Sequence, residues 1–182
     1  MKAGAMVFGL FRSKSDVRPA RIYARAVEAA RNPALYDRFS VPDTVDGRME
    51  MVMLHTGLVV SRLSATDGDR DLARDVSEAF FADMEGSLRE LGISDIAVPK
   101  KMKKVASAFY GRLQAYGEAA DEAALTAALS RNVHGGADHP TTPALARYVR
   151  TLAAVLRDAD AAAVIEGRAT VPEPQAFLDQ ET

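Results

Sequence analysis

Apolar positions spaced three and four residues apart dominate the middle of the chain, and they predict a helical hairpin over residues 70–117. Gly92 stands where the first helix should end, and Pro99 suits the first turn of the second. The two apolar arcs consist of Leu72, Val76, Phe80, Met84, Leu88 and Leu91, and of Met102, Val105, Ala106, Phe109, Leu113 and Tyr116. The pattern therefore indicates two amphipathic helices that meet at a short connector.

Residues 44–65 are apolar on nearly every side, which is typical of the buried central helix of a bundle. Asp43 or Thr44 is expected to cap this helix. His55 lies within it, and a lone histidine in such a helix is most often a hydrogen-bonded core residue. We expect that role for His55, with a ligand or catalytic role as the alternative.

The other periodic segments complete an all-α pattern. No segment alternates apolar and polar residues with a period of two, so no sheet is expected. The sequence predicts a single-domain helical bundle of six to eight helices over residues 18–168, between a flexible N-terminal arm (1–17) and a flexible C-terminal tail (169–182). The additional helices are expected over residues 18–31, 33–39, 121–134, 142–158 and 160–166.

Four lysines open the second helix of the hairpin: Lys100, Lys101, Lys103 and Lys104. Cations at a helix N-terminus are unfavourable by roughly 0.3–1 kcal/mol each, so helix stability alone does not favour them. One interpretation is a solvated polar face. The other is an anion-binding patch for a phosphate backbone, lipid headgroups or an acidic protein surface.

Composition excludes several classes of protein. The chain has 182 residues, a net charge of -2 and no cysteine, so disulfides and thiolate chemistry are excluded and bulk attraction to nucleic acid is not expected. No window reaches the ~20 apolar residues of a membrane span, and the N-terminus does not read as a signal peptide. We expect a cytoplasmic protein, either free or peripheral on the cytoplasmic face of the inner membrane.

Catalytic motifs are missing from the chain: it has no glycine-rich phosphate loop, HExxH, CxxC or GxSxG. The only ligand-like cluster is His134, Asp138 and His139, which can be an ordinary polar loop or a zinc site without an obvious fourth ligand. On the residues alone we predict a helical binding module that is not an enzyme, with no catalytic residue, cofactor, metal or small-molecule substrate.

Two long motifs carry a resemblance to a known family. They are VPDT-x-x-GR-x-E-x-x-x-LH, within residues 32–63, and FF-x-DM-x-x-x-LRE-x-G-x-x-D-x-x-V-x-KK-x-KK, within residues 79–112. Over roughly residues 20–117 the chain resembles the ubiquinol–cytochrome c chaperone family. The resemblance implies an all-α assembly factor of the cytochrome bc1 complex (complex III of the respiratory chain) that binds newly made cytochrome b, often with a small partner subunit. Mitochondrial members carry an additional N-terminal membrane-associated region, so the short arm suggests a bacterial member.

The residues offer a mechanism for this role as a hypothesis. Phe80, Phe81 and Met84 are expected to cradle a segment of the client, and the four lysines to hold ribosomal RNA, anionic headgroups or an acidic partner. Two alternatives remain open. One is a basic-patch binder of RNA or membrane surfaces with no specific client, and the other is a metal-dependent enzyme that uses the 134–139 loop and His55.

Overall fold

The structure, a computed structural model, describes residues 16–166, 169 and 172–178. In these residues it contains eight α-helices and no strand, which confirms the all-α prediction. The α-helices are α1 (Arg18–Ala30), α2 (Pro33–Asp37), α3 (Val45–Ser64), α4 (Arg70–Glu90), α5 (Val98–Gly117), α6 (Glu122–Val133), α7 (Thr142–Asp158) and α8 (Ala161–Glu166), and the 3-10 turns are η1 (Asp67–Asp69) and η2 (Pro174–Phe177).

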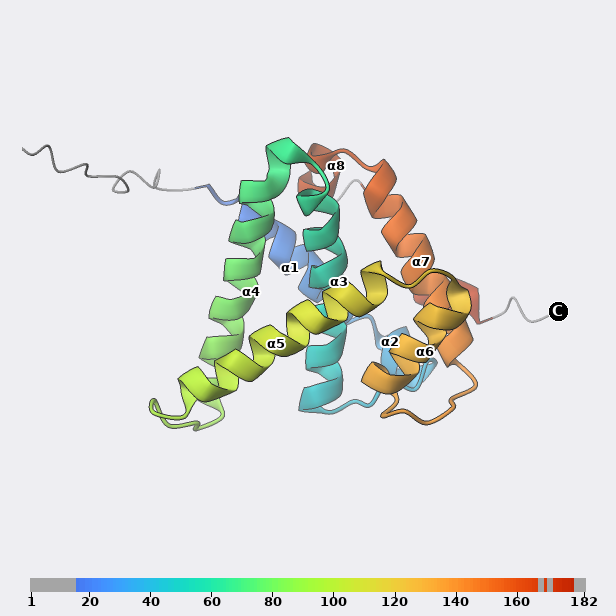
Figure 1. Cartoon of the computed structure of the whole chain (residues 1–182), viewed down its shortest axis with the longest axis horizontal. Helices are drawn as coiled ribbons and strands as arrows, with labels where there is room; N and C mark the ends of the chain where they lie inside the picture. Colours follow the sequence, from blue (N-terminus) through green and yellow to red (C-terminus); the bar gives the residue numbers. More distant parts are fainter. Residues whose placement is uncertain (1–15, 167–168, 170–171, 179–182) are drawn as a thin grey trace, which may run out of the picture.

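The central helix is α3, and it packs against α1, α4, α5 and α7. Figure 1 shows α3 in the middle of the view, with α4 on its left, α7 on its right and α5 crossing in front of it. Met51, Leu54 and Leu63 of α3 are almost completely buried, as expected for a helix that is apolar on most sides. The hydrophobic core therefore surrounds α3.

Local signals set the ends of the helices. The Oγ1 of Thr44 accepts a hydrogen bond from the backbone N–H of Gly47 at 3.1 Å and so caps α3. A Cβ atom at Gly47 would lie 1.9 Å from the carbonyl oxygen of Pro42, so only glycine allows the preceding loop to pass this closely. Gly92 ends α4 with a φ of 77°, a left-handed conformation that suits glycine.

The described part of the predicted C-terminal tail packs against the helices. Phe177 of η2 is buried, and its ring lies edge-on to Tyr148 with the centroids 5.9 Å apart. Its carbonyl oxygen accepts a hydrogen bond from Arg147 at 3.2 Å. Residues 172–178 therefore differ from the expected free tail, because Pro174 and Phe177 bury apolar surface there. The predicted arm (1–17) lies outside the described residues except for its last two positions.

Candidate interaction surface on the α4–α5 hairpin

An aromatic cluster joins α4 to α5. Phe80 and Phe109 are fully buried and stack with their centroids 4.7 Å apart and an interplanar angle of 24°. Phe81 is partly exposed and meets both rings edge-on, at 5.1 Å from Phe80 and 5.6 Å from Phe109. Tyr110 lies 6.0 Å from Phe81 and is 52% exposed. The cluster thus has a buried layer that supports an exposed one.

The three predicted client-contact residues of α4 are placed at different depths. Phe80 is completely buried, so in this structure it supports the exposed layer from beneath and is not part of the surface. Phe81 and Met84 are partly exposed and pack against the core. Tyr110 was not singled out from the sequence, although its position beside Phe109 and off the apolar arc of α5 is a usable signal.

Phe81 and Tyr110 also line a groove of about 420 Å³ between α3, α4 and α5. Its apolar wall includes Val60 and Leu113, and its other lining residues are Ser64, Arg70, Ala73, Arg74, Ser77 and Glu78. Partly exposed aromatic rings beside a concavity are features of protein-binding surfaces, where tyrosine and other aromatic residues are enriched. This groove is the feature of the hairpin best suited to an apolar segment.

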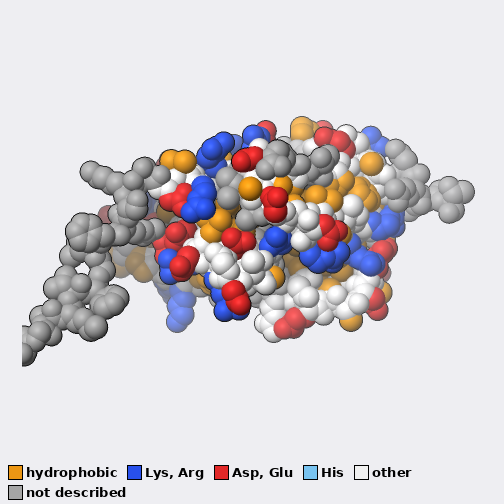
Figure 2. Space-filling model, turned by 90° about the horizontal axis from the view of Figure 1, so that it is seen from above, with side chains coloured by type: hydrophobic (Ala, Val, Ile, Leu, Met, Phe, Trp, Pro, Cys, Tyr) orange, Lys and Arg blue, Asp and Glu red, His pale blue; other side chains and the backbone are white. Residues whose placement is uncertain are grey.

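The lysines lie at the other end of the hairpin. Lys100, Lys101, Lys103 and Lys104 are all exposed, and among the residues described by the structure none of them takes part in a salt bridge. The first turn of α5 contains no acidic residue. On the face seen from above in Figure 2, by contrast, basic and acidic side chains are intermixed.

An ion pair between a buried carboxylate and a partly exposed arginine fixes α5 against α3. Glu50 of α3 is only 6% exposed, and the Nε of Arg112 donates to both of its carboxylate oxygens at 2.6 Å. The hydroxyl of Tyr116 donates to the same carboxylate at 3.1 Å. Burial, followed by the charge of Glu50, raises the pKa of Tyr116, so this hydroxyl stays protonated and remains a donor. The sequence placed the Glu50 carboxylate in an apolar helix, but it did not reveal the partner.

His55 is a hydrogen-bonded core residue, as the sequence predicted. Its Nδ1 lies 2.8 Å from the carbonyl oxygen of Met51, which can only accept, so Nδ1 carries the proton. Its Nε2 therefore accepts the hydrogen bond from the Tyr148 hydroxyl, which is also 2.8 Å long. Burial lowers the pKa of His55 to about 4, which keeps the ring neutral near pH 7.

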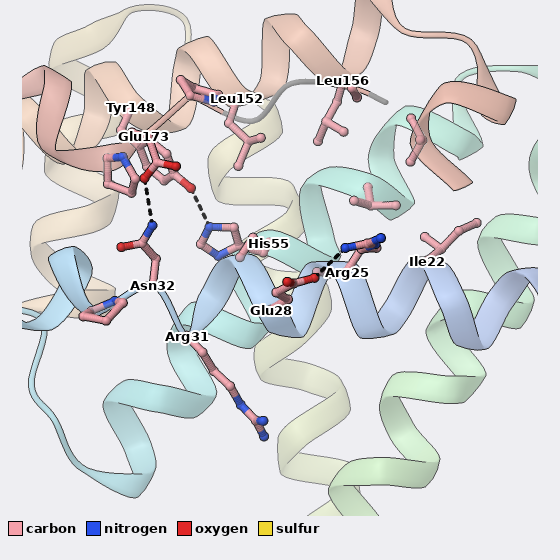
Figure 3. Close-up of a pocket in the computed structure, with 18 residues that line it drawn as sticks. Ile22, Arg25, Glu28, Arg31, Asn32, His55, Tyr148, Leu152, Leu156 and Glu173 are labelled. Atoms are coloured by element: carbon pink, nitrogen blue, oxygen red, sulfur yellow. Dashed lines mark hydrogen bonds and ion pairs between the residues drawn. The ribbon is translucent and has the colours of Figure 1, made fainter. Parts of the chain in front are cut away.

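His55 and Tyr148 lie at the inner wall of a cavity of about 590 Å³ between α1, α3, α7 and the C-terminal segment. Figure 3 shows His55 bonded to Tyr148, with the bond between Asn32 and Glu173 beside them. Ile22, Leu152 and Leu156 provide part of the apolar lining. Because both nitrogens of His55 are already bonded within the protein, neither is free to bind a ligand in this cavity.

The histidines of the 134–139 loop hold the loop to its neighbours. His134 and His139 stack with their centroids 4.7 Å apart. The Nε2 of His134 donates to the carbonyl oxygen of Phe39 at 3.2 Å, and its Nδ1 accepts from the Thr142 hydroxyl at 2.9 Å. Within the described residues, no three histidine, aspartate or glutamate side chains are grouped as metal ligands. Asp138 is exposed and adds no third ligand to the two rings.

The described part of the chain also contains no helix that combines the length and the hydrophobicity needed to cross a bilayer.

These features define an all-α protein whose α4–α5 hairpin presents an aromatic groove and an exposed row of lysines. The model of one protein family, described as "Ubiquinol-cytochrome C chaperone", matches residues 37–171. The match covers most of the chain, and the chain belongs to the ubiquinol-cytochrome C chaperone family.

Two individual proteins are similar to the chain. A solved structure, "Crystal structure of the Cbp3 homolog from Brucella abortus", superposes with a TM-score of 0.78 at 39% identity, covering 87% of this chain and 91% of that one. "Ubiquinol-cytochrome-c reductase complex assembly factor 1" of Xenopus laevis is 24% identical over 123 residues. That alignment covers 66% of this chain and 62% of the Xenopus protein, so the chain spans less than two thirds of this relative's length.

Proposed function

We propose that this chain is an assembly chaperone of the ubiquinol–cytochrome c reductase (bc1) complex and that its client is newly made cytochrome b. The family and the name of the Xenopus relative support the role in assembly. The proposal is for a binding function without catalysis, because a chaperone needs a surface that shields its client and no reacting group.

The observation that carries the proposal is the exposed layer of the aromatic cluster. Phe81 and Tyr110 keep part of their ring surface in water although they line a groove of about 420 Å³. Exposed aromatic surface beside a concavity is costly for a protein with no partner and useful for one that binds apolar segments. Cytochrome b spans the membrane several times, so its segments are apolar and need shielding before insertion is complete.

The buried groups beneath this groove give it a fixed shape. The Phe80–Phe109 stack holds α4 against α5, and the Glu50–Arg112 pair holds α5 against α3. A preformed groove loses less conformational entropy when it binds than a flexible surface does. Met84, one helical turn from Phe81, adds an adaptable apolar contact toward the tip of the hairpin. A small partner subunit and the ribosome are further partners that the family role suggests.

Site-specific photo-crosslinking tests the client and the surface together. A photoreactive amino acid replaces Phe81 or Tyr110 in cells that assemble the bc1 complex, and the matched control carries it at Ala123, an exposed position on α6. We expect cytochrome b to be captured from positions 81 and 110 and not from position 123. Capture of other proteins only, or equal capture from all three positions, contradicts the proposed surface.

Deletion of the gene tests the role itself. We expect selective loss of the assembled bc1 complex, measured by native gel electrophoresis and by the absorbance of haem b, with other respiratory complexes unchanged. Complementation with a Phe81→Ser/Tyr110→Ser double variant should restore the complex less well than complementation with Tyr110→Phe, which keeps the ring. Normal bc1 levels in the deletion strain would contradict the assembly role.

A further inference from the structure

The tip of the α4–α5 hairpin is the most exposed apolar point among the described residues. Ile96 is 94% exposed, more than any other large hydrophobic residue described. The turn that carries it already has helical hydrogen bonding, because the N–H of Val98 donates to the carbonyl oxygen of Ser94 at 3.1 Å. Lys100 and Lys103 are three residues apart and lie on one side of α5, and Ile96 precedes them in the turn that leads into this helix.

The same face continues along α5. Tyr110 comes seven residues after Lys103, which is two helical turns, and it is 52% exposed. Leu91, at the end of α4, adds a second apolar side chain at the tip and is 60% exposed. In Figure 1 this tip extends at the lower left, away from α6, α7 and α8. The face thus runs from an aliphatic tip through lysines to a tyrosine.

The acids of the tip offset only part of the positive charge of the four lysines. Asp95, the residue before Ile96, and Glu85 of α4 share one cation, Arg89, and Glu90 is also exposed at the end of α4. The partial positive charge at the N-terminus of α5 adds to the four exposed lysines. The whole chain has a net charge of -2, so any attraction to an anionic surface has to come from a local group of cations such as these lysines.

We propose that the tip of the α4–α5 hairpin docks on an anionic lipid bilayer, with Ile96 entering the interface and the lysines of α5 binding headgroup phosphates. An exposed aliphatic side chain beside lysines suits this partner, because it enters the acyl boundary while the ammonium groups stay at the headgroups. Tyr110 suits the same interface, where tyrosine is enriched. A nucleic acid is a poorer match, because Ile96 and Leu91 cannot stack on bases and the patch has lysines in place of arginines.

This inference does not depend on the assembly role, because it concerns a lipid surface and can be measured without a client. Docking through the tip and the lysine face of α5 would bring the Phe81–Tyr110 groove close to the bilayer. Such an orientation would suit any partner that emerges from the membrane.

Sedimentation with lipid vesicles tests the electrostatic part. We expect the full chain to bind vesicles of phosphatidylcholine mixed with phosphatidylglycerol, and to bind pure phosphatidylcholine vesicles much more weakly. Changing Lys100, Lys101, Lys103 and Lys104 to Gln should weaken binding by about fivefold per lysine, which is on the order of several hundredfold in total. The matched control changes four exposed arginines elsewhere to Gln and alters net charge equally: Arg21, Arg38, Arg131 and Arg157. Equal binding by the lysine variant and the wild type would overturn the proposal.

Fluorescence tests the apolar part. The chain contains no tryptophan, so Ile96→Trp places a single indole at the tip, and Ala123→Trp provides the control on α6. We expect a blue shift on adding anionic vesicles for Trp at position 96 and none at position 123. No shift at position 96 would overturn insertion of the tip. Tight, salt-sensitive binding of single-stranded RNA without vesicle binding would overturn the lipid assignment and make the lysines a nucleic-acid surface.

Discussion

Lowering the pH from about 7 to about 5 should destabilise the folded protein through His55. The ring is neutral in the fold, with Nδ1–H donating to Met51 and Nε2 accepting from Tyr148. Burial lowers the pKa of His55 from its ordinary value of 6.5 to about 4. At a pH between these two pKa values, His55 is protonated in the unfolded chain and neutral in the folded chain. The free energy of unfolding therefore falls as the pH is lowered from 6.5 to about 4. The stability that depends on neutral His55 is fully present above pH 6.5.

The size of the effect follows from the two pKa values of His55. Their separation, from 6.5 to about 4, corresponds to a total loss of about 3 kcal/mol below the lower value, at about 1.4 kcal/mol for each pH unit. Lowering the pH only from about 7 to about 5 should cost about 2 kcal/mol of this total. That is a large fraction of the stability of a typical domain, so the loss is readily measured.

Urea unfolding followed by circular dichroism measures this difference, with His55→Gln as the test variant. His55→Gln should be less stable than the wild type at pH 7, because Tyr148 loses its acceptor. Between about pH 7 and about pH 5, however, the variant should lose about 2 kcal/mol less of its free energy of unfolding than the wild type loses. His134 also has a pKa lowered by burial, so the comparison uses the difference between the wild type and each variant. His139→Gln is the matched control outside the core. The same pH dependence in the wild type and His55→Gln would refute the reasoning.

Three further substitutions test the packing around α3 and the α4–α5 hairpin. Arg112→Met should cost about 3–5 kcal/mol because it leaves the Glu50 carboxylate buried without its cation. A Glu50→Leu/Arg112→Met double variant should recover part of this in thermal unfolding, because the charge is removed but the Tyr116 hydroxyl loses its acceptor. Gly47→Ala should cost about 1–3 kcal/mol by urea unfolding, because its Cβ has no space, whereas Gly86→Ala has open space and should be neutral or stabilising. Phe80→Ala should cost about 3–5 kcal/mol and loosen the aromatic cluster, and a loss under about 1 kcal/mol in calorimetry would contradict its position in the core.

Helix positions were predicted well from the sequence because their signals are local. The central helix was expected over residues 44–65 and spans Val45–Ser64. Its cap at Thr44 and the end of α4 at Gly92 depend on residues within a few positions of the helix end. The role of His55 was predicted correctly for a related reason, since its apolar helix left it no exposed face.

The depth of each side chain and its distant partners were decided only by the tertiary structure. Periodicity places Phe80 and Phe81 on adjacent parts of one helix, but the packing of α5 buries the first and leaves the second partly exposed. Glu50 is paired with Arg112, which lies 62 positions later in the sequence. The η2 turn packs against α7, where the ring of Phe177 contacts that of Tyr148. A helical pattern states which face is apolar. It does not state which other element covers that face, because that depends on how all the helices share a single core.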